Sequence, residues 1–231
     1  MIRMGSSIGY AIMAAVCFAA PILVYLRAKR YDSAMIYPVI VGAIFYFLST
    51  RMCDLTVWIT LSAAPMSVKI AASSELVAVF EETARWLAMK YPVTNIKTSR
   101  AAFCYGIGHG GLECFIRGGI AIKLISQGRD MGLLPGVMGA LNMTVNLGVH
   151  IALSLLIYNK AHEEKSLKWL GAAILLHYAL NSLIFLTSFG GSDVFTEFAG
   201  VFLGVGLILI VYKIIGGENV LTEIKYHTDD I

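Results

Sequence analysis

Long apolar runs dominate this sequence and limit what it can fold into. Each extends for about 20 residues, the length that an α-helix needs to cross the hydrocarbon core of a bilayer. The 231 residues are 58% hydrophobic and only 14% charged, with a mean hydropathy of +0.74, whereas a soluble domain carries about a quarter charged residues. The sequence therefore predicts an all-α fold, a polytopic bundle of transmembrane helices surrounded by membrane lipids.

Hydropathy and charge positions predict seven spans, or eight if the fifth breaks between Pro135 and Gly139. Leu55–Met66 is apolar but too short to span, so we interpret it as a connection or a partly inserted piece. Residues 1–217 are expected to form one transmembrane domain, and residues 218–231 a short polar tail. The predicted spans are 8–26, 34–50, 67–90, 101–122, 133–159, 168–188 and 194–213.

The charges in the loops suggest an orientation and exclude some partners. If the first span ends in the cytoplasm, eleven Lys and Arg residues face the cytoplasm and six face the other side. The positive-inside rule then predicts an outside N-terminus and a cytoplasmic C-terminus. A net charge of +3 without a basic, aromatic-rich run argues against a nucleic-acid partner. The four cysteines form no C-x-x-C pair, so neither disulfides nor a thiolate metal site is expected.

A few titratable residues lie inside the predicted spans, where a charge costs several kcal/mol, and are therefore functional candidates. Glu81, His109, His150 and His177 each lie nine or ten residues from a basic residue at the cytoplasmic end of their span. At 1.5 Å per residue this is about 14 Å for each of them. The spacing predicts that four groups from four helices meet at one depth.

The residue types at this depth suit the activation of water. Glu81 and Glu82 are adjacent carboxylates, and Arg85 can pair with either of them and leave the other to hold a water. His177 and Asn181 share a helix face, from which both can stabilise one oxyanion. The pattern predicts a hydrolase acting on a peptide bond or a lipid, and the absence of G-x-S-x-G and H-E-x-x-H disfavours serine and site-two zinc enzymes.

Four segments carry motifs that belong together: E-E-T-A-R in 80–88, G-I-G-H-G-G-L-E in 105–113, the segment 150–156, and H-x-x-x-N in 177–181. In this combination the chain resembles the YhfC family of bacterial membrane proteins over roughly residues 75–185. That family is itself similar to the CAAX protease and bacteriocin-processing enzymes and to the PrsW proteases. The resemblance implies an intramembrane peptidase in a bacterial plasma membrane.

The CAAX-processing relatives combine E-E-x-x-x-R, a lone histidine and H-x-x-x-N. The resemblance therefore implies that Glu81 or Glu82 activates the attacking water and that His109 shares this water or its proton. It also implies that His177 and Asn181 polarise the scissile carbonyl and stabilise the oxyanion.

The surrounding residues carry further expectations. The arginine is one residue closer here than in the CAAX pattern, which leaves the identity of the base open; we favour Glu81 because Arg85 is its i+4 partner. Glu113 lies four residues after His109, so we expect it to orient that imidazole. Three residues, namely Arg85, Glu113 and His150, are expected to support the catalytic residues or to contact substrate.

Three rival interpretations remain open. The YhfC family, which the chain resembles, has also been described as metalloprotease-like, and Glu81, His109 and His177 could bind zinc. Because Arg85 would oppose a divalent cation, we expect no metal. The second rival is a non-catalytic scaffold or receptor, and the third a proton-coupled transporter. Our prediction is a glutamic-type intramembrane endopeptidase that cleaves a peptide or membrane-anchored protein in a cavity open to the cytoplasmic half of the membrane.

The other polar residues inside the spans receive simpler interpretations. Asn142 and Asn146 are expected to join helices by hydrogen bonds. Glu75 is expected near the outer interface.

Overall fold

The computed structural model describes residues 7–29, 35–91, 94, 96–190 and 194–216, with the backbone alone for 183–190. Within these residues the chain forms helices and no strands, which confirms the all-α prediction. The predicted polar tail, residues 218–231, lies outside the described part. The helices are α1 (Ile8–Lys29), α2 (Ile36–Thr60), α3 (Met66–Lys90), α4 (Ser99–Ser126), α5 (Leu133–Lys160), α6 (Ser166–Gly190) and α7 (Val194–Ile214).

Helix α2 is longer than predicted. The expected end at residue 50 is wrong, because the helix continues into the first half of the segment Leu55–Met66, which we interpret as a connection, and ends at Thr60. Arg51 and Asp54, which follow the expected end, form an i,i+3 ion pair of 2.9 Å on an exposed face. Because the two charges compensate each other, the helix tolerates them.

Helix α5 does not break at Pro135, so the described residues give no eighth helix. Pro135 lies in the first helical turn, where its missing N–H would have no helical partner. Four helices, α1, α2, α5 and α7, are long and apolar enough by themselves to cross a membrane. Helices α3 and α4 carry most of the charged residues that the sequence places inside spans.

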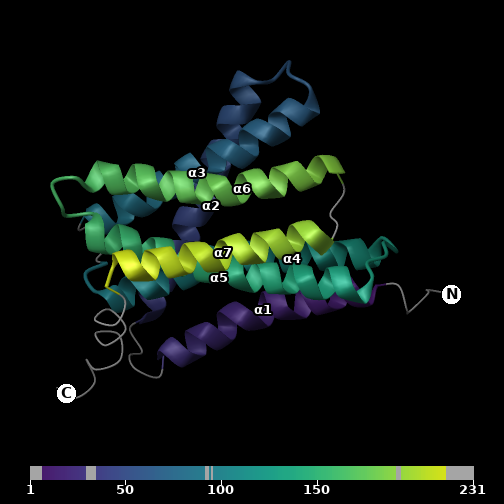
Figure 1. Ribbon diagram of the computed structural model, residues 1–231, viewed down its shortest axis with the longest axis horizontal. Coiled ribbons are helices and arrows are strands. Elements are labelled where there is room, and N and C mark those ends of the chain that lie inside the picture. The colour runs from purple at the N-terminus through teal and green to yellow at the C-terminus, as the bar shows by residue number, and fades with distance from the viewer. Residues whose placement is uncertain (1–6, 30–34, 92–93, 95, 191–193, 217–231) are drawn as a thin grey trace.

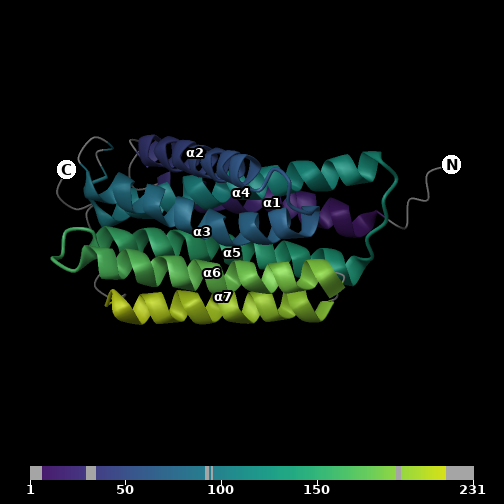
Figure 2. The same ribbon diagram turned by 90° about the horizontal axis from the view of Figure 1, so that it is seen from above.

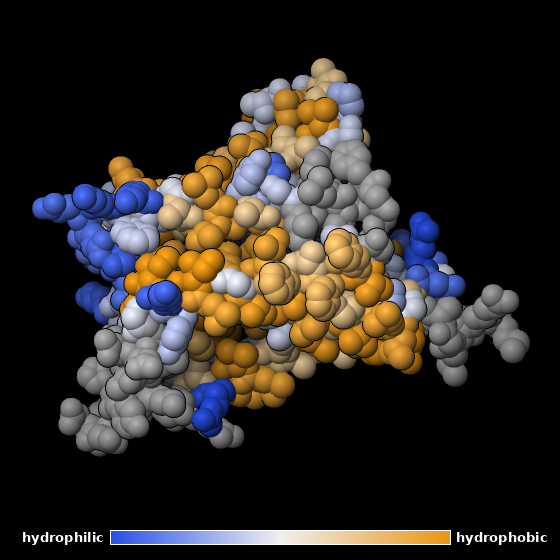
Figure 3. Space-filling model, in the orientation of Figure 1, coloured by the Kyte–Doolittle hydropathy of each residue, from blue (hydrophilic) through white to orange (hydrophobic). Residues whose placement is uncertain are grey.

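Helices α4 and α5 hold the bundle together. Helix α4 packs against α1, α2 and α5, and α5 also packs against α1, α6 and α7 (Figures 1 and 2). The connected ends of α2 and α3 project beyond α6 in Figure 1. Figure 3 shows hydrophobic residues over the middle of one face and hydrophilic residues toward its ends. Phe202 on α7 is 73% exposed, as expected of a lipid-facing side chain.

Glycines let α4 approach its neighbours closely. A Cβ atom at Gly106 would lie 2.6 Å from Cα of Ile151 on α5, and a Cβ at Gly108 would collide with the carbonyl of Val39 on α2. At Gly110 it would lie 2.9 Å from Cβ of His150. The glycine-rich motif thus brings α2 and α5 against α4 and makes room for His150 beside His109.

Candidate active site

The four titratable residues that the sequence placed at one depth meet in the centre of the bundle. Glu81 comes from α3, His109 from α4, His150 from α5 and His177 from α6, and all four are buried. The ring centroids of His109 and His150 are 5.0 Å apart, and those of His150 and His177 are 5.4 Å apart. The predicted convergence is therefore present.

Glu81 lies between two imidazoles. Its Oε2 is 3.0 Å from Nε2 of His109 and 4.0 Å from Nε2 of His177. An ionised carboxylate only accepts hydrogen bonds, so Nε2–H of His109 is the donor. No polar atom in the described residues pairs with the buried Nδ1 of His109. A carboxylate oxygen can accept more than one hydrogen bond, so Oε2 of Glu81 can accept another from the side of His177.

Glu82 has a different set of partners. Arg85 donates a short hydrogen bond to Oε1 of Glu82, and Nδ1 of His177 lies 2.8 Å from the same oxygen. Of the two pairings that helical spacing allows, the structure shows the one with Glu82, and the other end of Arg85 contacts Nδ1 of His150 on α5. Arg85 neutralises Glu82 and leaves Glu81 without an ion pair to arginine.

Glu113 contacts His150, and the expectation that it orients His109 is wrong. Its Oε2 lies 2.9 Å from Nε2 of His150 and accepts a 2.8 Å hydrogen bond from Asn146. Helix α5 packs against the face of α4 that carries Glu113, so Glu113 contacts His150 of α5 and not His109, four residues earlier on its own helix. Nδ1 of His150 lies 2.9 Å from the guanidinium of Arg85. His150 is then protonated at Nε2 and accepts at Nδ1.

The side chain of Asn181 is hydrogen-bonded to the backbone of α3 and not to the imidazoles. Its Nδ2 donates to the carbonyl of Ser74 on α3 at 3.0 Å. One residue later, Ser182 donates to Oε1 of Glu75 at 3.0 Å, so Glu75 takes part in a contact between α3 and α6. The role of Asn181 as an oxyanion donor stays a prediction.

Asn142 and Asn146 join helices, as the sequence predicted. Asn142 donates to Oε2 of Glu197 on α7 at 2.7 Å, and Asn146 donates to Glu113 on α4.

Two tyrosines border the site and were not predicted. The rings of Tyr46 and Tyr105 lie 5.2 Å and 5.9 Å from the ring of His109. Tyr105 is four residues before His109, so helical periodicity could have identified it. Tyr46 belongs to α2, and only the close approach of α2 to α4 brings it there. Both rings shield the His109 side of the site from lipid.

The site also satisfies the chemistry of a zinc centre. Glu81, His150 and His177 each offer a ligand atom, and these atoms lie within 4.8 Å of one another. His150 thus takes the place of His109 in the predicted ligand set. Each of these histidines also donates a ring N–H to a carboxylate, Glu113 or Glu82, as zinc-binding histidines usually do. The donor set fits zinc, although Arg85 occupies Nδ1 of His150.

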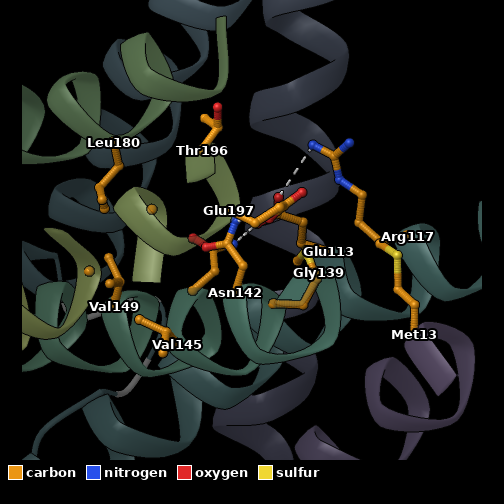
Figure 4. Close-up of a pocket in the computed structure, with 14 residues that line it drawn as sticks. Met13, Glu113, Arg117, Gly139, Asn142, Val145, Val149, Leu180, Thr196 and Glu197 are labelled. Carbon is orange, nitrogen blue, oxygen red and sulfur yellow. Dashed lines mark hydrogen bonds and ion pairs between the residues drawn. The ribbon is translucent and has the colours of Figure 1, made fainter. Parts of the chain in front are cut away.

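A cavity lies beside the site, on the side where α4 ends and α5 and α7 begin. It encloses, with its open mouth, about 850 Å³, and Glu113 and Arg117 contribute to its wall (Figure 4). In the orientation that the positive-inside rule predicts, this side faces the exterior. The expected opening toward the cytoplasmic half stays a prediction.

Comparison with known proteins supports the motif-based resemblance. The model of a family described as YhfC intramembrane metalloprotease matches residues 14–125, a little under half of the chain. This confirms the resemblance and supports an intramembrane protease in general terms. The matched range contains Glu81, Glu82, Arg85, His109 and Glu113, whereas His150, His177 and Asn181 lie beyond it. Neither the curated proteins nor the solved structures contain a match.

Proposed function

We propose that this chain, whose residues 14–125 match the model of the YhfC intramembrane metalloprotease family, hydrolyses a peptide bond of a membrane-associated polypeptide with water activated at Glu81. The observation that carries this proposal is the position of the Glu81 carboxylate between His109 and Nε2 of His177, in a buried site. Of the two adjacent glutamates, Glu82 pairs with Arg85, whereas Glu81 has no ion pair to an arginine among the described residues.

The gap between Glu81 and His177 suits one water molecule. A water at about 2.8 Å from each of two atoms that are 4.0 Å apart makes an angle of about 90° at its oxygen, close to the geometry of a water with two hydrogen-bond partners. Glu81 accepts a proton from this water while the oxygen attacks the scissile carbonyl carbon.

His177 stabilises the charge that the attack creates. Glu82 accepts the hydrogen bond from Nδ1–H of His177, which holds the ring in place and favours its protonated form, as the carboxylate of a catalytic triad does. A protonated His177 donates from Nε2 to the oxyanion. When the carbon–nitrogen bond breaks, the proton held by Glu81 passes to the leaving nitrogen.

A zinc-dependent version of the same activity is the second candidate, because Glu81, His150 and His177 provide a suitable donor set. A zinc ion held there would supply a Lewis acid that polarises water and the scissile carbonyl. In that case Glu82 and Glu113 keep their role, which is to hold the two imidazoles in the tautomers that face inward.

Hydrolysis by purified protein tests the proposal. We expect protein in lipid nanodiscs to cleave fluorescein-labelled β-casein, an unstructured polypeptide, and Glu81→Gln and His177→Ala to lower the rate at least about 100-fold, because each removes a proton acceptor or donor. Glu164→Gln is the matched control, because Glu164 lies exposed in the loop between α5 and α6.

The rivals make different predictions. A scaffold or receptor would leave β-casein intact in folded wild-type protein, and this outcome would reject the proposal. A transporter would show proton flux in proteoliposomes that Glu81→Gln removes, without cleavage of any polypeptide.

A further inference from the structure

The cavity between α4, α5 and α7 adjoins the active site. On α4, α5 and α6 a residue of its wall lies one helical turn from an active-site histidine. Glu113 is four residues from His109 on α4, and Asn146 is four residues from His150 on α5. Leu180 is three residues from His177 on α6. One turn of α-helix rises about 5.4 Å, so the cavity directly adjoins the imidazoles.

Its wall is partly polar and partly aliphatic. Asn142 and Asn146 each use one amide N–H in a hydrogen bond to a carboxylate, which leaves their carboxamide oxygens as acceptors. Val145, Val149 and Leu180 provide the aliphatic part (Figure 4). Amide groups between aliphatic side chains resemble the surroundings that a polypeptide backbone meets inside a protein.

Glu113 belongs to both the cavity and the active site. Oε2 contacts His150, whereas Oε1 lies 3.7 Å from Arg117, beyond hydrogen-bond distance. The side chain of Arg117 is 48% exposed, so the guanidinium can move without breaking a hydrogen bond to Glu113. When Arg117 moves aside, a molecule in the cavity can contact Glu113, which in turn contacts His150.

We infer that this cavity binds an extended segment of the polypeptide substrate, next to the scissile bond, with backbone N–H groups donating to Asn142 and Asn146 and aliphatic side chains against α5 and α6. The inference rests on the proposed protease function, for which it names the substrate-binding site. The cavity itself holds about 140 Å³, less than a pocket that encloses a drug-sized ligand, about 300 to 1,000 Å³. It therefore takes one or two side chains of the segment, and the rest of the segment lies in the open mouth.

Gly139 provides a way to fill the cavity with little disturbance. It lines the cavity on α5, and an added Cβ would meet only the flexible side chain of Met13, at 3.6 Å. Gly139→Leu therefore places an aliphatic side chain in the space that the substrate segment would occupy. Gly206 on α7 is the matched control, because it lies outside the cavity lining and a Cβ there meets nothing within 4 Å.

Binding is measured separately from hydrolysis in the Glu81→Gln background. Fluorescence anisotropy follows fluorescein-labelled β-casein with variant protein in nanodiscs. We expect Gly139→Leu to raise the Kd at least tenfold and Gly206→Leu to leave it unchanged. In chains that retain Glu81, Gly139→Leu should raise KM while kcat stays within threefold.

Equal binding of β-casein by the Gly139→Leu and Gly206→Leu proteins would overturn the inference. So would an equal loss of binding in both. Because the assay does not require cleavage, a cavity that binds β-casein without hydrolysis by wild-type protein would refute the proposed protease function and leave the binding site standing.

Discussion

The guanidinium of Arg85 lies 2.9 Å from Nδ1 of His150, and this contact joins α3 to α5 in the centre of the bundle. Both side chains are completely buried. Arg85 donates at the same time to Glu82, so one planar side chain links a carboxylate and an imidazole from different helices. This link decides which of the two adjacent glutamates is neutralised.

Removal of one partner from the Arg85–Glu82 pair should destabilise the fold strongly. A single Glu82→Leu or Arg85→Leu change leaves a buried charge, at a cost of about 3–5 kcal/mol. The double variant removes both charges and should recover most of that cost. Thermal unfolding of the four proteins in nanodiscs measures the coupling, and additive losses would show that the pair does not act as a unit.

Glu113 should decide the tautomer of His150. The contact of 2.9 Å at Nε2 of His150 requires a proton on that nitrogen. Glu113→Gln offers a carbonyl oxygen and should retain the Nε2–H tautomer. In Glu113→Ala only Arg85, which donates at Nδ1, still favours that tautomer, so its population should fall while it remains the major form. Long-range ¹⁵N–¹H spectra of histidine-labelled protein measure the tautomer, and His150→Asn identifies the signal. An unchanged spectrum in Glu113→Ala would contradict this role.

Asn181 and His177 should differ sharply in their effect on hydrolysis. Asn181 donates to the carbonyl of Ser74, so Asn181→Ala should lower stability by about 1 kcal/mol, the typical net value of a hydrogen bond, and should lower kcat less than tenfold. His177→Ala should lower kcat at least 100-fold. A loss of kcat as large in Asn181→Ala as in His177→Ala would support the oxyanion role that the sequence suggested.

The zinc-dependent version of the activity predicts that zinc binds to Glu81, His150 and His177. We expect added Zn²⁺ to raise the Tm, because a ligand at 100 times its Kd stabilises a protein by about 2.7 kcal/mol. His177→Ala should remove the shift, and His162→Ala, in an exposed loop, should retain it. Hydrolysis that persists after chelation would support the glutamic type, whereas hydrolysis that stops and returns with zinc would assign the metal-dependent type.

The sequence predicted those features that depend on the spacing of residues along one helix. Apolar runs predicted the helices, and distances along the chain to basic residues predicted that Glu81, His109, His150 and His177 meet. The predicted end of the second span at residue 50 was too early, because α2 continues past Arg51 and Asp54, whose charges form an ion pair within the helix.

The pairing inside the site was not accessible to the same reasoning. Arg85 reaches Glu81 and Glu82 equally well by helical spacing, and the structure pairs it with Glu82 while it contacts His150, 65 residues away on α5. Glu113 faces both His109 on its own helix and His150 on the next, and the packing of α5 against α4 selects His150.

By itself the sequence determined that this protein is a helical membrane bundle with its scarce charges at one depth, because hydropathy and helical rise depend on neighbouring residues alone. Only the tertiary structure decided which carboxylate is left without arginine, which imidazoles it lies between and where the adjoining cavity opens. These relations are distances between side chains of different helices, and they depend on how closely the glycines of α4 allow the helices to pack.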